Sequence, residues 1–337
     1  MKRIKEFILG IKEKLFPSNG KKSFLAEMRT GNKIQREKMD WGTWKRRNLN
    51  LNGLGKLIWI ILRFVIIVGI SYMILYPFVV KFVVAFSSTE DIVDNTVMYI
   101  PRQGSTYFLE RAMLNMNYWK SFMNTALLSL FVSVFQLFVA SVAGYGFARF
   151  KFKGRDLLFV LVLLTLMIPA QTIQLPLYVR FSHFLGTDLN LINTFWPLVI
   201  LSMFGLGLKN GLYIYLMRQF FRGLPKELEN SAYIDGAGFF RTFISIMLPN
   251  AANMMITVFL FSFTWQWTDT TYNRMLMPKL EILANKAATV ASSIKDEAQQ
   301  MAINDTACLL IILPLLIVFL FAQRYFIQSI ERSGLVE

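Results

Sequence analysis

Long apolar runs recur along the chain, and their lengths predict the fold class. A helix needs about 20 mostly apolar residues to cross the hydrocarbon core of a bilayer. Six runs approach or exceed this length, at residues 57–86, 122–148, 157–173, 191–216, 249–267 and 307–325. The sequence lacks the short alternating segments of a membrane barrel, and backbone groups in lipid pair within a helix. The pattern therefore predicts an all-α membrane protein with six transmembrane helices.

Two of these runs contain residues that disfavour a continuous helix. Residues 157–173 form the shortest run and carry Pro169 near the end. Residues 191–216 include small residues around one lysine, namely Gly205, Gly207, Lys209 and Gly211. Because glycine weakens a helix interior, we expect the fourth helix to kink or break at this cluster.

The distribution of charge sets the expected orientation. The chain has 36 Lys and Arg against 21 Asp and Glu, which gives a net charge of +15. Basic residues concentrate in residues 1–56, 149–155 and 217–248, whereas the other connections have mixed signs. Because basic loops remain in the cytoplasm, we expect these segments and both termini inside the cell. The apolar runs make an anionic lipid bilayer the expected partner of the positive charge, and no nucleic acid is expected.

Residues 1–56 form a basic N-terminal segment that precedes a transmembrane domain of residues 57–337. The first 16 residues place five apolar side chains on one helical face, namely Ile4, Phe7, Ile8, Ile11 and Leu15. Lysines occupy the opposite face, as is typical of a helix that lies in the membrane surface. A solvated basic tail is the alternative interpretation.

Residues that carry enzyme chemistry are scarce. The single cysteine, Cys308, excludes an intrachain disulfide, and with the single histidine, His183, it leaves too few ligands for a His/Cys zinc site. The phosphate loop and the common hydrolase and metalloprotease motifs are absent from the sequence. We therefore expect no enzyme activity, no metal and no cofactor, and any energy from ATP must come from another chain.

Residues 223–250, between the fourth and fifth runs, carry the most specific pattern. Pro225 suits the first turn of a helix, and Glu227 and Glu229 follow where the helix dipole favours acids. Four small residues come next, namely Ala232, Gly236, Ala237 and Gly238. Small residues permit a sharp bend or the close approach of another backbone. We expect a helix–turn–helix at the cytoplasmic face, which either docks into the cleft of a partner or packs on its own bundle.

The same residues resemble the EAA loop of the permeases of binding-protein-dependent ABC importers. That motif has Glu-Ala-Ala, a glycine six residues after the glutamate, and then Ile-x-Leu-Pro. The spacing is met here at Asn230-Ser231-Ala232, Gly236, Ile246, Leu248 and Pro249. Asp235-Gly236-Ala237 is similar to the Asp-Gly-Ala of the sugar-importing branch. The chain departs from the motif at Asn230 and Ser231, where the family has Glu and Ala.

Segments outside the loop carry the same resemblance. They include residues 143–149 (AGYGFAR), 175–178 (LPLY), 266–269 (QWTD) and 330–335 (IERSGL). The likeness covers roughly residues 57–337, and the chain looks like the maltose-type permease without a large external domain.

The resemblance implies the type I ABC importer permease fold and half of a transmembrane path for a sugar or oligosaccharide in the bacterial plasma membrane. A second homologous permease would form the other half. Two cytosolic ATPase subunits would bind the EAA coupling helices, and an extracellular binding protein would deliver the solute. The residues expected at or beside the ATPase-docking surface are Glu227, Asn230, Ala232, Asp235, Gly236, Ala237 and Arg241.

Polar residues inside the runs are candidates for the solute path, because polar groups in lipid are costly and face a cavity or another helix. They are Asn124, Gln136, Gln171, Lys209, Asn210 and Asn253, and Trp267 adds an aromatic face for a sugar ring. For each amide, a hydrogen bond between helices is the alternative role.

Two other classes of function are alternatives. A secondary transporter without an ATPase would need coupling acids within the spans and an inverted repeat, and the six runs contain no Asp or Glu. A membrane enzyme would need a cluster of His, Asp or Cys at the membrane face, and the sequence offers none. Co-purification of a stoichiometric ATPase would separate the three.

Overall fold

The computed structural model describes residues 51–94, 96–97 and 99–334. The chain divides into two compact units, residues 1–75 and 76–337, each of which is described by itself. Across the described residues the regular structure is helical, with one isolated β-bridge between Ser87 and Gly104. The prediction of an all-α protein is therefore confirmed. The surface helix expected in residues 1–16 lies outside the described residues.

The first described helix, α4 (Leu51–Ala85), contains the first predicted span almost to its end. It belongs to the first unit as far as Leu75 and to the second unit from Tyr76. Within the second unit, the Lys81 ammonium on α4 forms an ion pair with Asp305.

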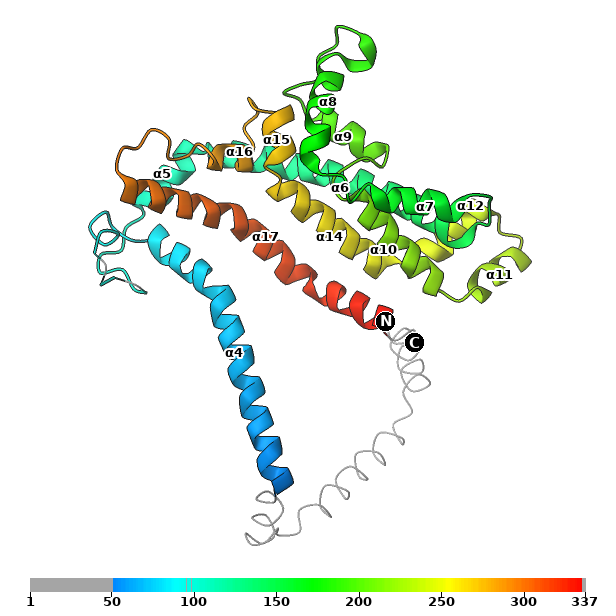
Figure 1. Ribbon diagram of the computed structural model, residues 1–337, viewed down its shortest axis with the longest axis horizontal. Coiled ribbons are helices and arrows are strands. Elements are labelled where there is room, and N and C mark those ends of the chain that lie inside the picture. The colour runs from blue at the N-terminus through cyan, green and yellow to red at the C-terminus, as the bar shows by residue number, and fades with distance from the viewer. Residues whose placement is uncertain (1–50, 95, 98, 335–337) are drawn as a thin grey trace, which may run out of the picture. The chain divides into compact units, whose positions relative to one another are not determined.

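The second unit is built around α6 (Tyr118–Arg149), a helix of 32 residues that contains the second predicted span. Three shorter helices pack along it, namely α9 (Trp196–Met203), α10 (Asn210–Gly223) and α14 (Ala252–Thr268), as Figure 1 shows. Gly144 permits the crossing of α6 and α10, because a Cβ there would lie 2.6 Å from the Cβ of Met217.

The C-terminal helix α17 (Glu297–Gly334) contains the sixth predicted span and packs against α14 and α5 (Tyr107–Asn115). The short helices α15 (Thr271–Leu276) and α16 (Leu283–Ala287) lie in the connection between α14 and α17. Figure 1 shows α5 and α16 at the opposite end of the second unit from α11 and α12.

The third and fourth predicted spans are each divided into two helices. The third run becomes α7 (Arg155–Leu164) and α8 (Ala170–Ser182), and the 3-10 turn η1 (Phe184–Gly186) follows. Proline lacks an N–H and disfavours a helical residue before it, so the chain leaves the helix ahead of Pro169.

The break in the fourth run falls at the expected glycine cluster. α9 ends at Met203 and α10 begins at Asn210. Between them Gly205 and Lys209 adopt left-handed backbone conformations, with φ of +74° and +58°. A left-handed residue cannot continue a right-handed helix, so the two positions set the limits of the break.

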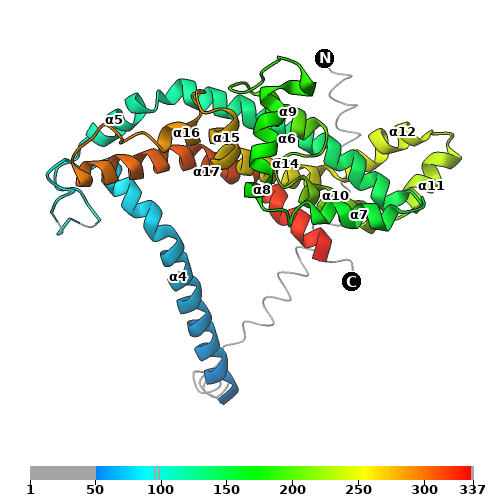
Figure 2. The same ribbon diagram turned by 45° about the horizontal axis from the view of Figure 1, so that its top comes forward.

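Residues 223–250 form a series of short helices before α14. These are α11 (Glu227–Ile234), α12 (Phe239–Thr242), the π-helical turn η2 (Phe243–Met247) and α13 (Leu248–Asn250). The helical stretch Phe239–Asn250 meets α14 at 77°. Figure 2 shows α11 and α12 at one extremity of the second unit, past the ends of α7 and α10.

Three helices of the described residues are long and apolar enough to cross a bilayer, namely Gly55–Ala85, Tyr118–Arg149 and Glu297–Arg324. The bent pair before and including α14 makes a fourth if it is one span. The predicted third and fourth spans fall short of this length because each is interrupted. The count of six spans therefore stays a prediction.

Candidate functional site

The helix–turn–helix expected from the sequence is present, and Gly236 forms its turn. Gly236 has φ of +79°, between α11 and α12. Its amide donates to the carbonyl of Tyr233 (3.1 Å), and the amide of Ala237 donates to the carbonyl of Ala232 (2.9 Å). This pair of bonds is the Schellman arrangement, which ends a helix and favours glycine at the left-handed position. The glycine in the sequence motif therefore has a local cause in the backbone.

The turn carries an exposed apolar tip. Ile234 and Phe240 are 85% and 75% exposed, and Tyr233 is 47% exposed. The polar side chains of Asn230, Asp235 and Arg241 are exposed around them. Large apolar side chains exposed together in one short segment are typical of a site that binds another protein or a membrane.

The seven residues expected for docking divide between exposed and buried positions. Glu227, Asn230, Asp235, Gly236 and Arg241 are exposed, Ala237 is half-buried, and Ala232 is buried. Ala232 therefore packs inside this chain, and the exposed surface of the loop belongs to the other residues.

Glu229 holds the buried side of α11 to the end of α6. The sequence placed it in the first turn of this helix but gave it no role at the site. The Tyr145 hydroxyl donates a hydrogen bond of 2.6 Å to Oε1 of Glu229. The Nε of Arg149 lies 3.2 Å from Oε2 of the same carboxylate, and these two side chains are only 8% and 10% exposed. Tyr145 and Arg149 are four residues apart on α6, so they share one face of that helix. This spacing was the one sequence signal that could have identified the pair.

Both side chains from α6 make further contacts with the loop. Nη2 of Arg149 donates to the carbonyl of Leu224, just before α11 (2.7 Å). The ring of Tyr145 stacks on Phe239 of α12 and contacts Phe243 of η2, with centroid distances of 5.5 and 4.8 Å. The last turn of α6 therefore contacts both helical arms of the loop.

A cavity of about 360 Å³ lies where the two broken helices meet. Its polar and aromatic lining comes from Thr165, Ser202, Lys209, Asn210, Gln266 and Tyr272. The amide nitrogen of Asn210 donates to the carbonyl of Gly205 (3.0 Å). The ammonium of Lys209 lies 5.3 Å from the centroid of the Trp265 ring, within the range of a cation–π contact.

The candidates for the solute path are placed unevenly around this cavity. Lys209 and Asn210 line it directly. Gln136 is buried behind it, where Nε2 donates to the carbonyl of Leu208 (3.0 Å) and Oε1 accepts from Ser262. Gln136 thus fixes the backbone of the break. Its role here is the alternative one, a hydrogen-bond link between helical elements.

The other candidates lie away from the lining of the cavity. Asn124 donates to the carbonyl of Glu281 (2.9 Å), Asn253 is half-buried in α14, and Gln171 is exposed in the first turn of α8. Trp267 is 2% exposed, and its indole N–H donates to the carbonyl of Ile311 (3.1 Å). Trp267 therefore belongs to the hydrophobic core between α14 and α17.

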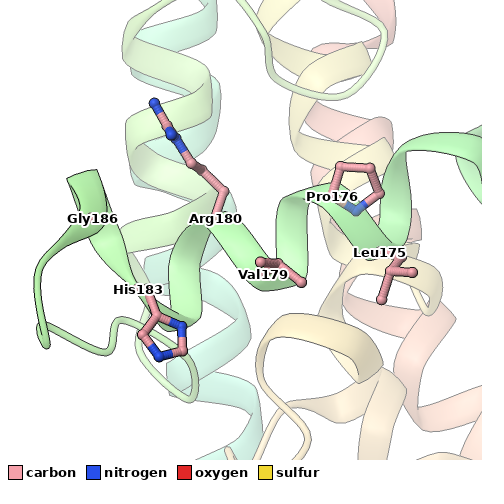
Figure 3. A pocket seen from close by; sticks show the side chains of 6 residues that line it. All are labelled: Leu175, Pro176, Val179, Arg180, His183 and Gly186. Atoms are coloured by element: carbon pink, nitrogen blue, oxygen red, sulfur yellow. The ribbon is translucent and has the colours of Figure 1, made fainter.

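A shallow hollow of about 490 Å³ follows one face of α8 and η1. Its lining consists of Leu175, Pro176, Val179, Arg180, His183 and Gly186. Figure 3 shows the side chains of Arg180 and His183 pointing in different directions from the helix. The two polar groups do not converge, and the hollow offers no catalytic arrangement. Among the described residues, no group of three or more His, Cys, Asp and Glu side chains could hold a metal ion.

Comparison with known proteins decides the family. Residues 136–332 match the family model of the binding-protein-dependent transport system inner membrane component. The chain belongs to this family. The permease resemblance in the sequence is thereby confirmed, and the chain is a multi-pass membrane component of an ABC transporter rather than an enzyme.

Relatives of this permease have names that refer to oligosaccharides. It is 30% identical over 221 residues to the arabinooligosaccharides transport system permease protein AraQ of Bacillus subtilis, which covers 64% of this chain and 73% of that protein. It is 27% identical over 217 residues to the maltodextrin transport system permease protein MdxG of the same species, covering 64% of this chain and 75% of that protein.

The fold of this permease is similar to that of a solved transporter. The match is a chain of a bacterial ABC transporter involved in the import of the acidic polysaccharide alginate. The TM-score is 0.67 at 20% identity, and the alignment covers 81% of this chain and 98% of the other. The similarity establishes an ABC transporter permease fold for this chain.

Proposed function

We propose that this permease forms half of the translocation path of an ATP-driven importer for a sugar or oligosaccharide. A second, homologous permease forms the other half, two cytosolic ATPase subunits supply the energy, and an extracellular binding protein delivers the solute. The family match and the names of the relatives support this assembly.

The helix–turn–helix of residues 223–250 is the proposed contact with the ATPase. The single observation that supports it best is the exposed apolar tip, with Ile234 and Phe240 beside the Schellman turn at Gly236. A short helix closed by such a turn presents a fixed surface, and buried apolar area stabilises a protein interface. We assign the docking surface to the exposed Glu227, Asn230, Asp235, Gly236 and Arg241 and to the half-buried Ala237.

The proposed orientation places this loop, residues 149–155 and both termini in the cytoplasm. The transmembrane domain is residues 57–337, with six spans, and residues 1–56 precede it. The basic residues of the cytoplasmic segments support this orientation through the positive-inside rule. The chain needs no cofactor of its own, since ATP binds to the partner subunits. In this assembly ATP binding favours one of two global states, and the loop transmits that preference.

We assign the cavity at the broken helices to the solute path. The ammonium of Lys209 and the side-chain amide of Asn210 offer hydrogen-bonding groups to the hydroxyls of a sugar. The Trp265 ring lies beside Lys209. Helix breaks at membrane depth occur where the backbone lines a cavity or is buried in protein, which fits this position. Gln171 is exposed at the start of α8, the helix whose Ala170 and Ile173 line the cavity.

The test is purification of the tagged permease from its native membrane in mild detergent, together with uptake assays. We expect one ATPase subunit per permease, and ATP-dependent uptake of at least one member of a radiolabelled panel of arabino-, malto- and galacto-oligosaccharides. A permease that purifies without an ATPase, or uptake that persists after ATP depletion, would overturn the importer. Failure of every oligosaccharide with the ATPase present would overturn only the solute class.

A further inference from the structure

The contacts at the end of α6 have a geometry that docking does not require. Glu229 lies on α11, yet its carboxylate is buried and points to α6, away from the exposed tip. A buried ion pair needs additional hydrogen bonds to offset the desolvation of its charges. Glu229 receives one from the Tyr145 hydroxyl, and Arg149 donates one to the carbonyl of Leu224.

These contacts fix both arms of the loop to one helix. Arg149 contacts the chain before α11 and the carboxylate within it, whereas Tyr145 contacts α11 through its hydroxyl and α12 through its ring. The covalent links from the loop to the bundle are residues 224–226 on one side and the bent stretch of η2 and α13 on the other. Neither link is a straight continuous helix, so the side-chain contacts are the stiff connection.

α6 is suited to carry a displacement from the loop to the rest of the unit. Its 32 residues correspond to a rod of about 48 Å. At mid-length, Gln136 donates to the carbonyl of Leu208 in the break that borders the cavity. Near its start, Asn124 donates to the carbonyl of Glu281 in the opposite connection. One helix thus contacts the loop, the break beside the cavity and the far end.

We propose that Glu229, Arg149 and Tyr145 form a buried strut that passes movement of the 223–250 loop to α6. The strut acts within this chain, so it sets the coupling between ATP hydrolysis and transport and leaves affinity for the ATPase unchanged. This inference rests on the proposed function. Glu229 and Arg149 are positioning residues, because neither one touches ATP or the solute.

The experiment compares strut variants in the assembled complex. Glu229→Gln removes the charge and leaves Arg149 buried without an ion-pair partner. Tyr145→Phe removes one hydrogen bond and keeps the ring contacts. The double variant Glu229→Arg with Arg149→Glu reverses the pair. Asp156→Asn is the matched control, because Asp156 forms an ion pair with Arg155 near the same end but its side chain is 75% exposed.

Four quantities are measured for each variant: the amount in the membrane, the ATPase subunits that co-purify, the rate of ATP hydrolysis, and uptake of the radiolabelled oligosaccharide panel. We expect Glu229→Gln to keep its ATPase subunits and to lose about tenfold in uptake per ATP hydrolysed, within the usual range of coupling energies. Tyr145→Phe should lose less, the reversed pair should regain most of the loss, and the control should match the unmodified permease.

Several results would overturn the strut. Normal uptake per ATP in Glu229→Gln would contradict it. A loss of ATPase subunits in Glu229→Gln that the reversed pair fails to restore would also contradict it, because Glu229 would then contact the partner subunit. If Glu229→Gln fails to reach the membrane, Tyr145→Phe decides, and a normal ratio in that variant contradicts the proposal.

Failure of the proposed function has a different signature. The unmodified permease would then lack an ATPase, while a double-mutant cycle of Glu229→Gln and Arg149→Gln on thermal unfolding would still detect the ion pair. A cycle without coupling would contradict the strut itself.

Discussion

The amide of Ala237 donates a hydrogen bond of 2.9 Å to the carbonyl of Ala232, across the left-handed Gly236. This bond fixes the angle between α11 and α12 and hence the position of the exposed tip. Apart from the two adjacent residues, no atom of the described residues would lie within 4 Å of a Cβ on Gly236, so the backbone conformation is what demands glycine here. Close approach at this site would involve a partner.

Gly236→Asp is therefore expected to leave the permease in the membrane and to uncouple it from the ATPase. The backbone strain is about 1–2 kcal/mol, which a folded bundle tolerates. The measurement is ATP-dependent uptake with the amount of permease in the membrane as reference. Gly238→Ala is the control, because Gly238 has an ordinary φ of −73° and open space at its Cβ. Full uptake and normal assembly in Gly236→Asp would refute the role of the turn.

A second prediction concerns the crossing of α6 and α10. Gly144→Ala should lower stability by about 1–3 kcal/mol, because the added Cβ would meet the Met217 Cβ at 2.6 Å and the Arg218 backbone nitrogen at 2.9 Å. Gly146→Ala, two residues later, meets only the Phe150 ring at 3.8 Å and serves as the control. Thermal unfolding of the purified proteins gives the difference. Equal unfolding midpoints for the two variants would contradict the close crossing of α6 and α10 at Gly144.

A third prediction tests the cavity. Lys209→Gln removes the charge beside Trp265 and should change the concentration dependence of oligosaccharide uptake by a factor of about three to ten, an effect expected when one good polar contact is lost. The number of co-purified ATPase subunits should stay unchanged, because the whole length of α10 separates Lys209 from the loop. Unchanged uptake at every concentration would place the solute path elsewhere.

A fourth prediction concerns pH and Glu281. The Lys120 ammonium (2.8 Å), the Asn117 amide and the Lys286 ammonium hold the pKa of Glu281 at about 2, below its usual 4.5. A lowered pKa in the folded state stabilises the protein above the unfolded pKa, and the benefit is lost as the pH falls through the folded pKa. The benefit is thus complete above pH of about 5 and disappears between about 4.5 and 2.

Glu281→Gln should therefore reduce stability by about 0.5–1 kcal/mol at pH 7, the range for partly exposed ion pairs. Unfolding midpoints of the two purified proteins should differ most at pH 7, and the difference should be clearly smaller at pH 3. A difference of the same size at both pH values would mean that the cluster acts through packing instead of charge.

Several elements could be predicted from the sequence because their causes are local. The apolar runs at residues 57–86 and 307–325 correspond to α4 and α17. The glycine cluster predicted the break before α10, and the small residues around Gly236 predicted the turn. In each case a property of neighbouring residues decides the outcome.

Other features depend on residues that are distant in the chain. The strut joins Glu229 to Tyr145, 84 positions earlier, and no periodic pattern connects them. The sequence predicted that Trp267 offers an aromatic face to a sugar ring. In the structure its indole N–H donates a hydrogen bond to the carbonyl of Ile311 on α17. The family resemblance implied that Ala232 lies at or beside the docking surface, whereas its side chain is buried within this chain. Tertiary contacts decide these roles.

The central claim is that the tip at Ile234 meets an ATP-hydrolysing subunit in the cytoplasm. The most direct test places a photo-crosslinking amino acid at Ile234 in the intact membrane complex, with Leu189 in the connection between the third and fourth runs as the control position. We predict a covalent adduct with the ATPase from Ile234 and none from Leu189. An adduct with an extracellular protein, or no ATPase adduct from Ile234, would contradict the claim.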